Sequence, residues 1–108
     1  MPPIENLSAS ECAARLAGNE PPVLLDVRTP REHRSHRIPG ATAMPLHELA
    51  DRVDELDPDR PVLVYCEHGV RSLSACAFLA ERGFRNIANL QGGIVRWNGR
   101  LEGEDVRR

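Results

Sequence analysis

A cysteine and an arginine bracket a short loop near the middle of the chain. Four residues separate Cys66 from Arg71, and Gly69 stands among them, where a turn can need a positive φ or a close backbone approach. The apolar run 62–65 precedes the cysteine, and apolar residues at helical spacing follow Ser72. We therefore expect a tight loop between a buried strand and a helix, with backbone N–H groups that converge above the helix N-terminus.

Such a loop predicts a nucleophilic cysteine at its start. Convergent N–H groups, the helix dipole and the charge of Arg71 all favour a thiolate, which is the reactive form of cysteine. Cys66 is therefore the candidate nucleophile, and Arg71 is the candidate group that stabilises it and holds an anionic substrate. The other loop residues surround the sulfur and form the candidate substrate-binding set: Glu67, His68, Gly69, Val70 and Ser72.

The cysteines and the loop histidine also have structural alternatives. Cys66 could be an inert core cysteine, although its place beside Arg71 between a strand and a helix favours reactivity. His68 could exchange protons with an acceptor, or its side chain could point into solvent. Cys12 and Cys76 lie on predicted helices among apolar residues, so we expect them to be small buried hydrophobes.

Length and composition bound the class of protein. The 108 residues predict one domain, 1–108, which is large enough to bury a core without disulfides or metal. Three cysteines and an N-terminus without a basic and apolar leader favour a cytoplasmic location. The net charge of −2 argues against nucleic acid as a partner, and no apolar stretch approaches the roughly 20 residues of a membrane span. All 14 basic residues are arginines, which excludes lysine-dependent catalysis.

Hydrophobic patterning and turn residues divide the chain into alternating strands and helices. Strands are predicted at residues 4–7, 23–27, 43–46, 62–65 and 87–90. Helices are predicted at about 8–17, from 29 to before Pro39, at 47–56 and from 72 to Gly83, with a helical turn at 94–98. This alternation predicts an α/β fold of three layers, with a mainly parallel sheet and helices on both faces.

Two of the helix starts carry a capping-box pattern. Ser8 and Glu11 have the spacing at which each side chain bonds the other residue's backbone N–H group. Thr29 and Glu32 repeat that spacing, with a proline at the first helical position between them. Gly18 is expected to close the first of these helices, because glycine readily adopts the backbone conformation that ends a helix.

Polar residues end a second buried strand. Asp26 and Arg28 close the run 23–27, and the carboxyl ends of parallel strands meet at one edge of a sheet, where ligands bind. We expect both residues to support the site, with Asp26 accepting hydrogen bonds from loop groups or pairing with Arg71. The alternative is that Asp26 and Arg28 only anchor loops.

Basic residues cluster just after that strand. His33 and His36 stand three residues apart, as metal ligands can, but no group of Cys or Glu ligands accompanies them. We therefore expect no metal site, and His36 is better suited to fixing a turn. Arginines also recur at every third residue, at Arg28, Arg31, Arg34 and Arg37. They could dock an acidic partner, but a solvated helix face is the favoured interpretation.

Three motifs stand in order along the chain. The first is Leu25-Asp26-Val27-Arg28, followed by Glu32 and by residues 36–41, which read His-Arg-Ile-Pro-Gly-Ala. The second is the loop Cys-x-x-Gly-x-Arg-Ser, and the third is Leu90-Gln91-Gly92-Gly93 with Trp97. Together they resemble the rhodanese family of sulfurtransferases, except that Arg37 separates the usual His and Ile. Cysteine-dependent phosphatases have a loop that is one residue longer.

This resemblance extends from Leu24 to Trp97 and implies both a fold and a reaction. The fold would be a five-stranded parallel sheet flanked by helices, and the reaction would be a ping-pong sulfur transfer without a cofactor. Cys66 would take a sulfane sulfur from thiosulfate, a polysulfide or a persulfide, and would pass it to cyanide, a small thiol or a thiol protein. The alternatives are a non-catalytic rhodanese-like binding module and, less favoured by the loop length, a cysteine phosphatase or arsenate reductase.

Glu67 adds an expectation about the sulfur donor. Its carboxylate directly follows the nucleophile, on a loop that otherwise suits anions. In a mostly solvated mouth this charge opposes a dianion such as thiosulfate by roughly 1 to 1.5 kcal/mol, and by about half as much once salt screens it. We therefore expect the protein to favour donors that carry less negative charge, or a protein donor that offers a basic patch.

Overall fold

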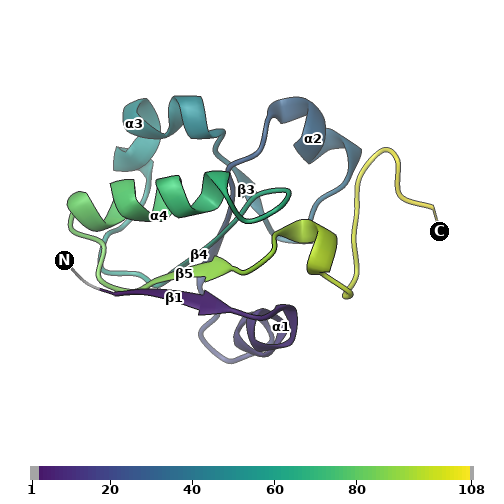
Figure 1. The fold of residues 1–108 in the computed structure, drawn as a ribbon, viewed down its shortest axis with the longest axis horizontal. Helices are drawn as coiled ribbons and strands as arrows, with labels where there is room; N and C mark the ends of the chain where they lie inside the picture. Colours follow the sequence, from purple (N-terminus) through teal and green to yellow (C-terminus); the bar gives the residue numbers. More distant parts are fainter. Residues whose placement is uncertain (1–2, 108) are drawn as a thin grey trace.

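A computed structural model describes residues 3–107, which form a parallel sheet of five strands between two layers of helices (Figure 1). The strands lie in the order β1-β5-β4-β2-β3, and every neighbouring pair is parallel. Their bounds are β1 Ile4–Leu7, β2 Val23–Asp26, β3 Thr42–Ala43, β4 Val62–Tyr65 and β5 Ile87–Leu90. The expected fold class is therefore confirmed.

The helices cover both faces of this sheet. Their bounds are α1 Ala9–Leu16, α2 Pro30–Ser35, α3 Leu49–Arg52 and α4 Arg71–Glu81. Short 3-10 turns add η1 Leu46–Glu48, η2 Val53–Glu55 and η3 Ile94–Arg96. In Figure 1, α3 and α4 lie over one face of the sheet and α1 lies under the other. No helix within residues 3–107 is long and apolar enough to cross a membrane.

The strands alternate their side chains between two apolar cores. Leu25 and Val64 face the layer that contains α3 and α4, where they meet Leu79. Leu63 faces the opposite layer, where it meets Cys12 of α1. Because helices cover both faces, β4 is buried along its whole length, which explains why it reads as an unbroken apolar run.

Local sequence signals account for most of these elements. Both predicted capping boxes are present, with Ser8 pairing with Glu11 and Thr29 pairing with Glu32. The helix α1 ends at Leu16 with Ala17 as its C-cap, so Gly18 follows its end as expected, but Gly18 is not among the glycines with a positive φ and does not form a left-handed cap.

Two segments differ from the prediction. The brief strand expected within 43–46 is β3, Thr42–Ala43, which starts one residue earlier and ends before Pro45 because proline has no N–H group to offer a neighbouring strand. The helix expected at 47–56 is broken into η1, α3 and η2, none of which starts with a side-chain cap. Short uncapped turns often tighten to 3-10 geometry. Leu49 and Val53 still reach the core from this segment.

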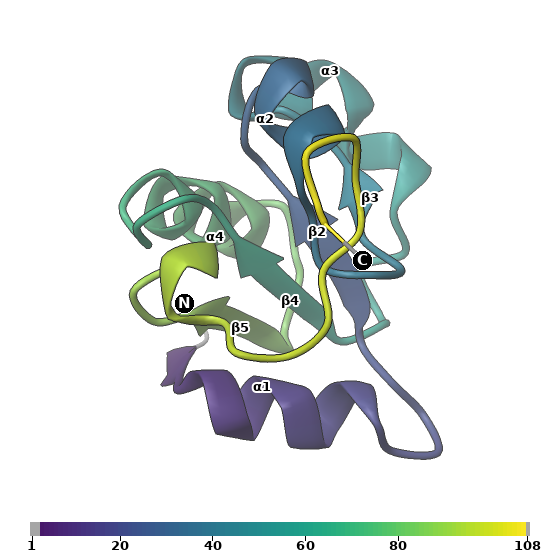
Figure 2. The same cartoon turned by 90° about the vertical axis from the view of Figure 1, so that its right-hand side faces the viewer.

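After η3 the chain runs back and lies against α2. We did not expect this path from the sequence. We call residues 101–107 the C-terminal segment, which lies beside α2 (Figure 2). Arg37 and Glu102 form an antiparallel bridge, with N···O distances of 2.8 and 2.9 Å. The N–H groups of Glu104 and Asp105 donate to the carbonyls of Arg34 and Ser35, so the segment satisfies carbonyls at the end of α2.

Candidate active site

Cys66 lies where β4 ends, and backbone amides point at its sulfur. The N–H groups of Gly69 and Ser72 donate to Sγ over 3.1 and 3.2 Å. Gly69 has a φ of 91°, which turns the loop back toward the cysteine. The side chain is almost fully buried, with Cys66 only 1% exposed. The arrangement of amides expected from the sequence is present, and it can stabilise a negative charge on this sulfur.

A second segment, residues 93–95, contacts the backbone of the cysteine loop, which runs from Cys66 to Arg71. The N–H group of Ile94 donates to the carbonyl of Cys66 over 2.9 Å, and that of Val95 donates to the carbonyl of Glu67 over 3.3 Å. The two backbones meet so closely that a Cβ at Gly93 would lie 2.2 Å from the Glu67 carbonyl oxygen. Glycine is therefore required at this crossing, because no side chain fits between the two loops.

Arg71 begins α4 and forms a bidentate ion pair with Glu32 of α2. Its two terminal nitrogens lie 2.8 and 2.9 Å from the Glu32 carboxylate oxygens. The hydrogen bond from Arg71, opposed by burial and helped by the N–H of Thr29, lowers the pKa of Glu32 to about 2. Of the two roles considered for Asp26, pairing with Arg71 is therefore wrong, because Arg71 pairs with Glu32 and Asp26 has other partners. Arg71 keeps 38% of its side chain exposed, so an anion in solvent can reach it.

Asp26 and Arg28 form a buried ion pair beneath the site. The guanidinium nitrogens of Arg28 lie 3.0 and 2.8 Å from the two carboxylate oxygens of Asp26. The Tyr65 hydroxyl donates to the same carboxylate over 3.0 Å, and His33 Nδ1 lies 2.8 Å from it. Burial raises the pKa of Asp26, but the hydrogen bonds from Arg28 and His33 outweigh it and hold that pKa below its usual value.

Arg28 also connects this ion pair to the cysteine loop. Its Nη1 donates to Glu67 over 3.1 Å, and its Nη2 donates to the backbone carbonyl of His36. The expectation that Glu67 lies in a mostly solvated mouth is therefore wrong, since its side chain is only 24% exposed and its carboxylate is paired with Arg28. Arg28 thus shares its single positive charge between Asp26 and Glu67, and it offsets the charge of Glu67 only in part. Asp26 and Arg28 thus support the loop through Glu67 and not through Arg71.

A chain of hydrogen-bonded polar side chains leads from the sulfur to the exposed Asn6, and we did not predict it from the sequence. The Cys66 thiol donates to the Ser72 hydroxyl over 3.3 Å, and that hydroxyl donates to Oδ1 of Asn89. Asn89 Nδ2 donates to Oδ1 of Asn6 over 2.9 Å. The signal for this chain was an asparagine in the middle of the otherwise apolar strand β5.

The remaining loop residues face outward. His68 is exposed, and Val70 is 73% exposed. His36 Nδ1 lies 3.1 Å from the Ser35 hydroxyl, while His33 contacts Asp26. Within residues 3–107 no three His, Cys, Asp or Glu side chains gather in a way that could hold a metal ion.

The other two cysteines lie in the cores. Cys12 and Cys76 are both fully buried. Burial raises the pKa of the Cys12 thiol to about 11 and that of the Cys76 thiol to about 12. Both thiols are therefore neutral at physiological pH, as expected for small core residues.

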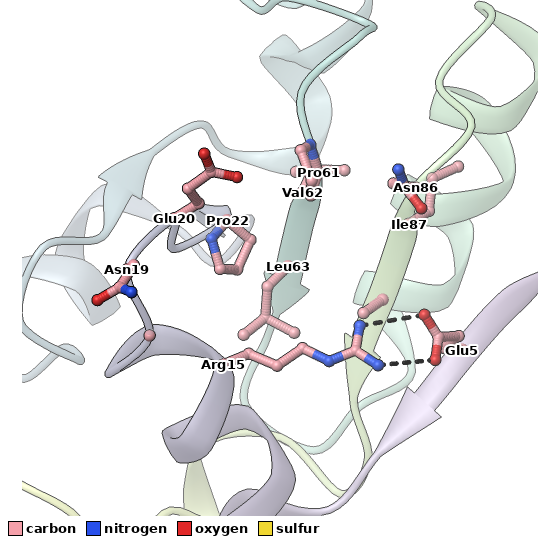
Figure 3. A pocket seen from close by; sticks show the side chains of 12 residues that line it. Glu5, Arg15, Asn19, Glu20, Pro22, Pro61, Val62, Leu63, Asn86 and Ile87 are labelled. Carbon is pink, nitrogen blue, oxygen red and sulfur yellow. Dashed lines mark hydrogen bonds and ion pairs between the residues drawn. The ribbon is translucent and has the colours of Figure 1, made fainter.

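Two hollows flank the sheet at opposite ends. A hollow of about 530 Å³ lies beside the cysteine loop, and its lining includes Glu32, Glu67 and Glu104 of the C-terminal segment. A second hollow of about 370 Å³ lies at the amino ends of β4 and β5, with Leu63 in its wall and the Arg15–Glu5 ion pair at its rim (Figure 3). The second hollow is therefore separated from Cys66 by the length of the strands.

Comparisons with known proteins agree with this geometry. The family model for the rhodanese-like domain matches residues 8–100. A sulfurtransferase of Allochromatium vinosum is 38% identical over 87% of this chain and 88% of its own length. The thiosulfate sulfurtransferase GlpE of Pseudomonas entomophila is 38% identical over 79% of this chain and 78% of its own length.

Solved structures share the fold as well. The crystal structure of a rhodanese-like domain protein from Staphylococcus aureus has a TM-score of 0.85 and 26% identity, covering 93% of this chain and 98% of that one. The crystal structure of a thiosulfate sulfurtransferase from Pseudomonas aeruginosa has a TM-score of 0.80 and 33% identity, covering 97% of this chain and 21% of that one. By its sequence, its sheet order and its cysteine loop, this chain belongs to the rhodanese-like domain family.

Proposed function

We propose that this protein is a sulfurtransferase that carries a sulfane sulfur on Cys66 as a persulfide. The observation that carries the proposal is the pair of amides from Gly69 and Ser72 aimed at a nearly buried sulfur. The relatives named sulfurtransferase and thiosulfate sulfurtransferase support the same activity. No cofactor is needed, since sulfur supplies the nucleophile, the leaving group and the transferred atom.

The first half-reaction loads the cysteine. The Cys66 thiolate attacks the outer sulfur of a donor such as thiosulfate, and an S–S bond forms between them. The S–S bond of thiosulfate breaks at the same time, and sulfite leaves with the bonding electron pair. The two amides hold the sulfur of Cys66 in place, and Arg71 attracts the anionic donor to the mouth.

The second half-reaction transfers the sulfur. Cyanide or a thiolate attacks the outer sulfur of the persulfide and forms thiocyanate or a new persulfide. The bond to Cys66 breaks, and its electron pair returns to the thiolate, which the amides of Gly69 and Ser72 again stabilise. Because Cys66 is nearly buried, a small thiol or the exposed thiol of a partner protein can attack only if the outer sulfur of the persulfide reaches solvent.

Uptake of sulfur from a donor and its transfer to an acceptor can be measured separately. Purified protein is incubated with thiosulfate, with an inorganic polysulfide or with glutathione persulfide, and its intact mass is measured before and after addition of cyanide. We expect one added sulfur on the protein, which cyanide then removes as thiocyanate. Cys66→Ser is expected to take up no sulfur at all.

Matched variants test the assignment of the sulfur to Cys66. Cys12→Ala and Cys76→Ala remove the core thiols and are expected to keep the added sulfur and the thiocyanate production. Uptake of sulfur by Cys66→Ser within a few-fold of the parent would overturn the mechanism. A folded parent protein that takes sulfur from none of the three donors would point to the non-catalytic binding module.

A further inference from the structure

The polar chain behind the nucleophile has a defined direction. Asn89 lies on β5, and its Nδ2 donates to Oδ1 of Asn6 on β1 over 2.9 Å. This contact turns Oδ1 of Asn89 toward Ser72. An amide oxygen can only accept a hydrogen bond, so the Ser72 hydroxyl must donate its single proton to Asn89.

The direction of that bond decides how Ser72 meets the cysteine. With its proton directed at Asn89, the Ser72 oxygen presents lone pairs to Sγ of Cys66 over 3.3 Å. Lone pairs accept a hydrogen bond from a thiol and repel a thiolate. The backbone N–H of the same residue does the opposite, because it donates to Sγ over 3.2 Å. Ser72 therefore favours the thiol through its side chain and the thiolate through its backbone.

We propose that Asn89 is a positioning residue that holds the Ser72 hydroxyl as an acceptor for the Cys66 thiol and so restrains the nucleophile in its protonated form at rest. When the thiolate forms, the hydroxyl can turn to the sulfur only by giving up its bond to Asn89. The inference rests on the proposed role of Cys66, but its test uses the resting protein and no sulfur donor. The two proposals can therefore fail separately.

Charged and titratable groups around Cys66 do not reproduce this effect. Arg71 of α4 is paired with Glu32 of α2, and Glu67 of the loop is paired with Arg28 beside β2. Cys76, one turn further along α4, is fully buried and holds its proton. None of these groups is within hydrogen-bonding contact of Asn89, so a change at Asn89 acts on the sulfur through Ser72.

The test measures how fast iodoacetamide alkylates Cys66 as a function of pH, read by peptide mass spectrometry. Asn89→Ala frees the Ser72 hydroxyl to donate to the thiolate. We expect alkylation below the midpoint pH to become roughly three- to ten-fold faster, the effect of one neutral hydrogen bond. Asn89→Asp offers a stronger acceptor and adds a negative charge, so we expect slower alkylation. A purely structural role would not produce shifts of opposite sign.

Three further variants separate this role of Asn89 from a general structural role. In a Ser72→Ala background, Asn89→Ala should have no further effect, because the hydroxyl that connects the two residues is gone. Asn86→Ala changes an asparagine just before β5 and should leave the pH profile unchanged. If Asn89→Ala does not fold, Asn6→Ala removes the exposed contact that orients Asn89, and faster alkylation is again expected. Unchanged or slower alkylation in a folded Asn89→Ala or Asn6→Ala variant would overturn the inference.

Discussion

At the scale of single residues, Arg71 is a cation that already has a partner. Its bidentate pair with Glu32 fixes the guanidinium near the mouth but also neutralises much of its charge. An anionic donor must therefore share Arg71 with Glu32. If the proposed mechanism holds, the two residues should affect the donor in opposite ways, and substitutions at each test this.

Arg71→Ala should lower kcat/KM for thiosulfate by roughly ten- to a hundred-fold, the effect of one lost charge-assisted contact. Steady-state thiocyanate production checks this. The control is Arg31→Ala, which removes an exposed arginine from α2. Equal losses in both variants would mean that only the overall charge of this surface matters.

Glu32→Gln should instead lower KM for thiosulfate, by roughly two- to five-fold at low salt, because it leaves the charge of Arg71 free for the donor. The gain should shrink as salt is added. A higher KM, or a gain that does not depend on salt, would indicate that Glu32 serves to aim Arg71 and not to compete for it.

Glu67→Gln should change thiosulfate turnover by less than about two-fold, because Arg28 partly offsets the Glu67 carboxylate and salt screens the remaining charge. This differs from the larger effect expected for a solvated carboxylate. The check is kcat/KM for thiosulfate in low salt, with thermal unfolding as a control for the lost contact to Arg28. A five-fold gain in kcat/KM would instead show that the Glu67 carboxylate repels thiosulfate as a solvated charge would.

The sequence predicts the contacts of this site between residues that are close in the chain, but not those between residues that are far apart in it. Cys66, Gly69 and Ser72 are neighbours in the chain, so their spacing was enough to predict amides around the sulfur. Arg71 meets Glu32 across 39 positions, and Glu32 already had an evident role as a helix cap. Glu32 bonds both Thr29 and Arg71, and the spacing of residues in the sequence predicts only its contact with nearby Thr29.

At the scale of elements, the first turn of α2 positions the carboxylate that holds Arg71. Glu32 accepts the backbone N–H of Thr29, while the Thr29 hydroxyl accepts the N–H of Glu32. The C-terminal segment supports the other end of this six-residue helix. A helix this short depends on its caps, because it forms few internal hydrogen bonds.

Thr29→Ala should lower the free energy of unfolding by about 1 kcal/mol, the usual effect of losing an N-cap, and the melting temperature by about 5 °C. Thermal unfolding followed by circular dichroism checks this. Thr29→Ser keeps the capping hydroxyl and is expected to melt close to the parent. Equal losses in both variants would show that the methyl group of Thr29, and not its hydroxyl, stabilises the helix.

Elements with strong local signals were predicted well, and those shaped by distant contacts were not. The strands β4 and β5 read as apolar runs with turn residues around them. The segment after β3 also has apolar residues at helical spacing, but spacing alone does not show that its pieces lack side-chain caps. The path of the C-terminal segment depends on its contacts with Arg34, Ser35 and Arg37, which lie far away in the sequence.

At the scale of the whole molecule, two depressed carboxyl pKa values limit stability in acid. The hydrogen bond from Arg71 lowers the pKa of Glu32 from 4.5 to about 2, and the pKa of Asp26 is also below its usual value. A group with a lowered folded-state pKa contributes stability above its unfolded pKa and loses it as the pH falls through the folded one. Stability should therefore be lost between about pH 4.5 and pH 2.

The measurement is the urea midpoint at a series of pH values across this window. The parent should lose stability steadily as the acid increases, whereas Glu32→Gln should start less stable and lose about 1 kcal/mol less, since the pair is partly exposed and solvent screens it. Parallel curves for the two proteins would show that the Glu32–Arg71 pair does not contribute to the acid limit.

The crossing of the two loops also determines when the site is complete during synthesis of the chain. The carbonyls of Cys66 and Glu67 are held by N–H groups of Ile94 and Val95, which a ribosome adds almost thirty residues after the cysteine. Until those residues emerge and β5 pairs, the cysteine loop lacks its backing and Ser72 lacks Asn89. A growing chain therefore lacks both the backing of the cysteine loop and the contact between Ser72 and Asn89, and the site is complete only when the last strand is in place.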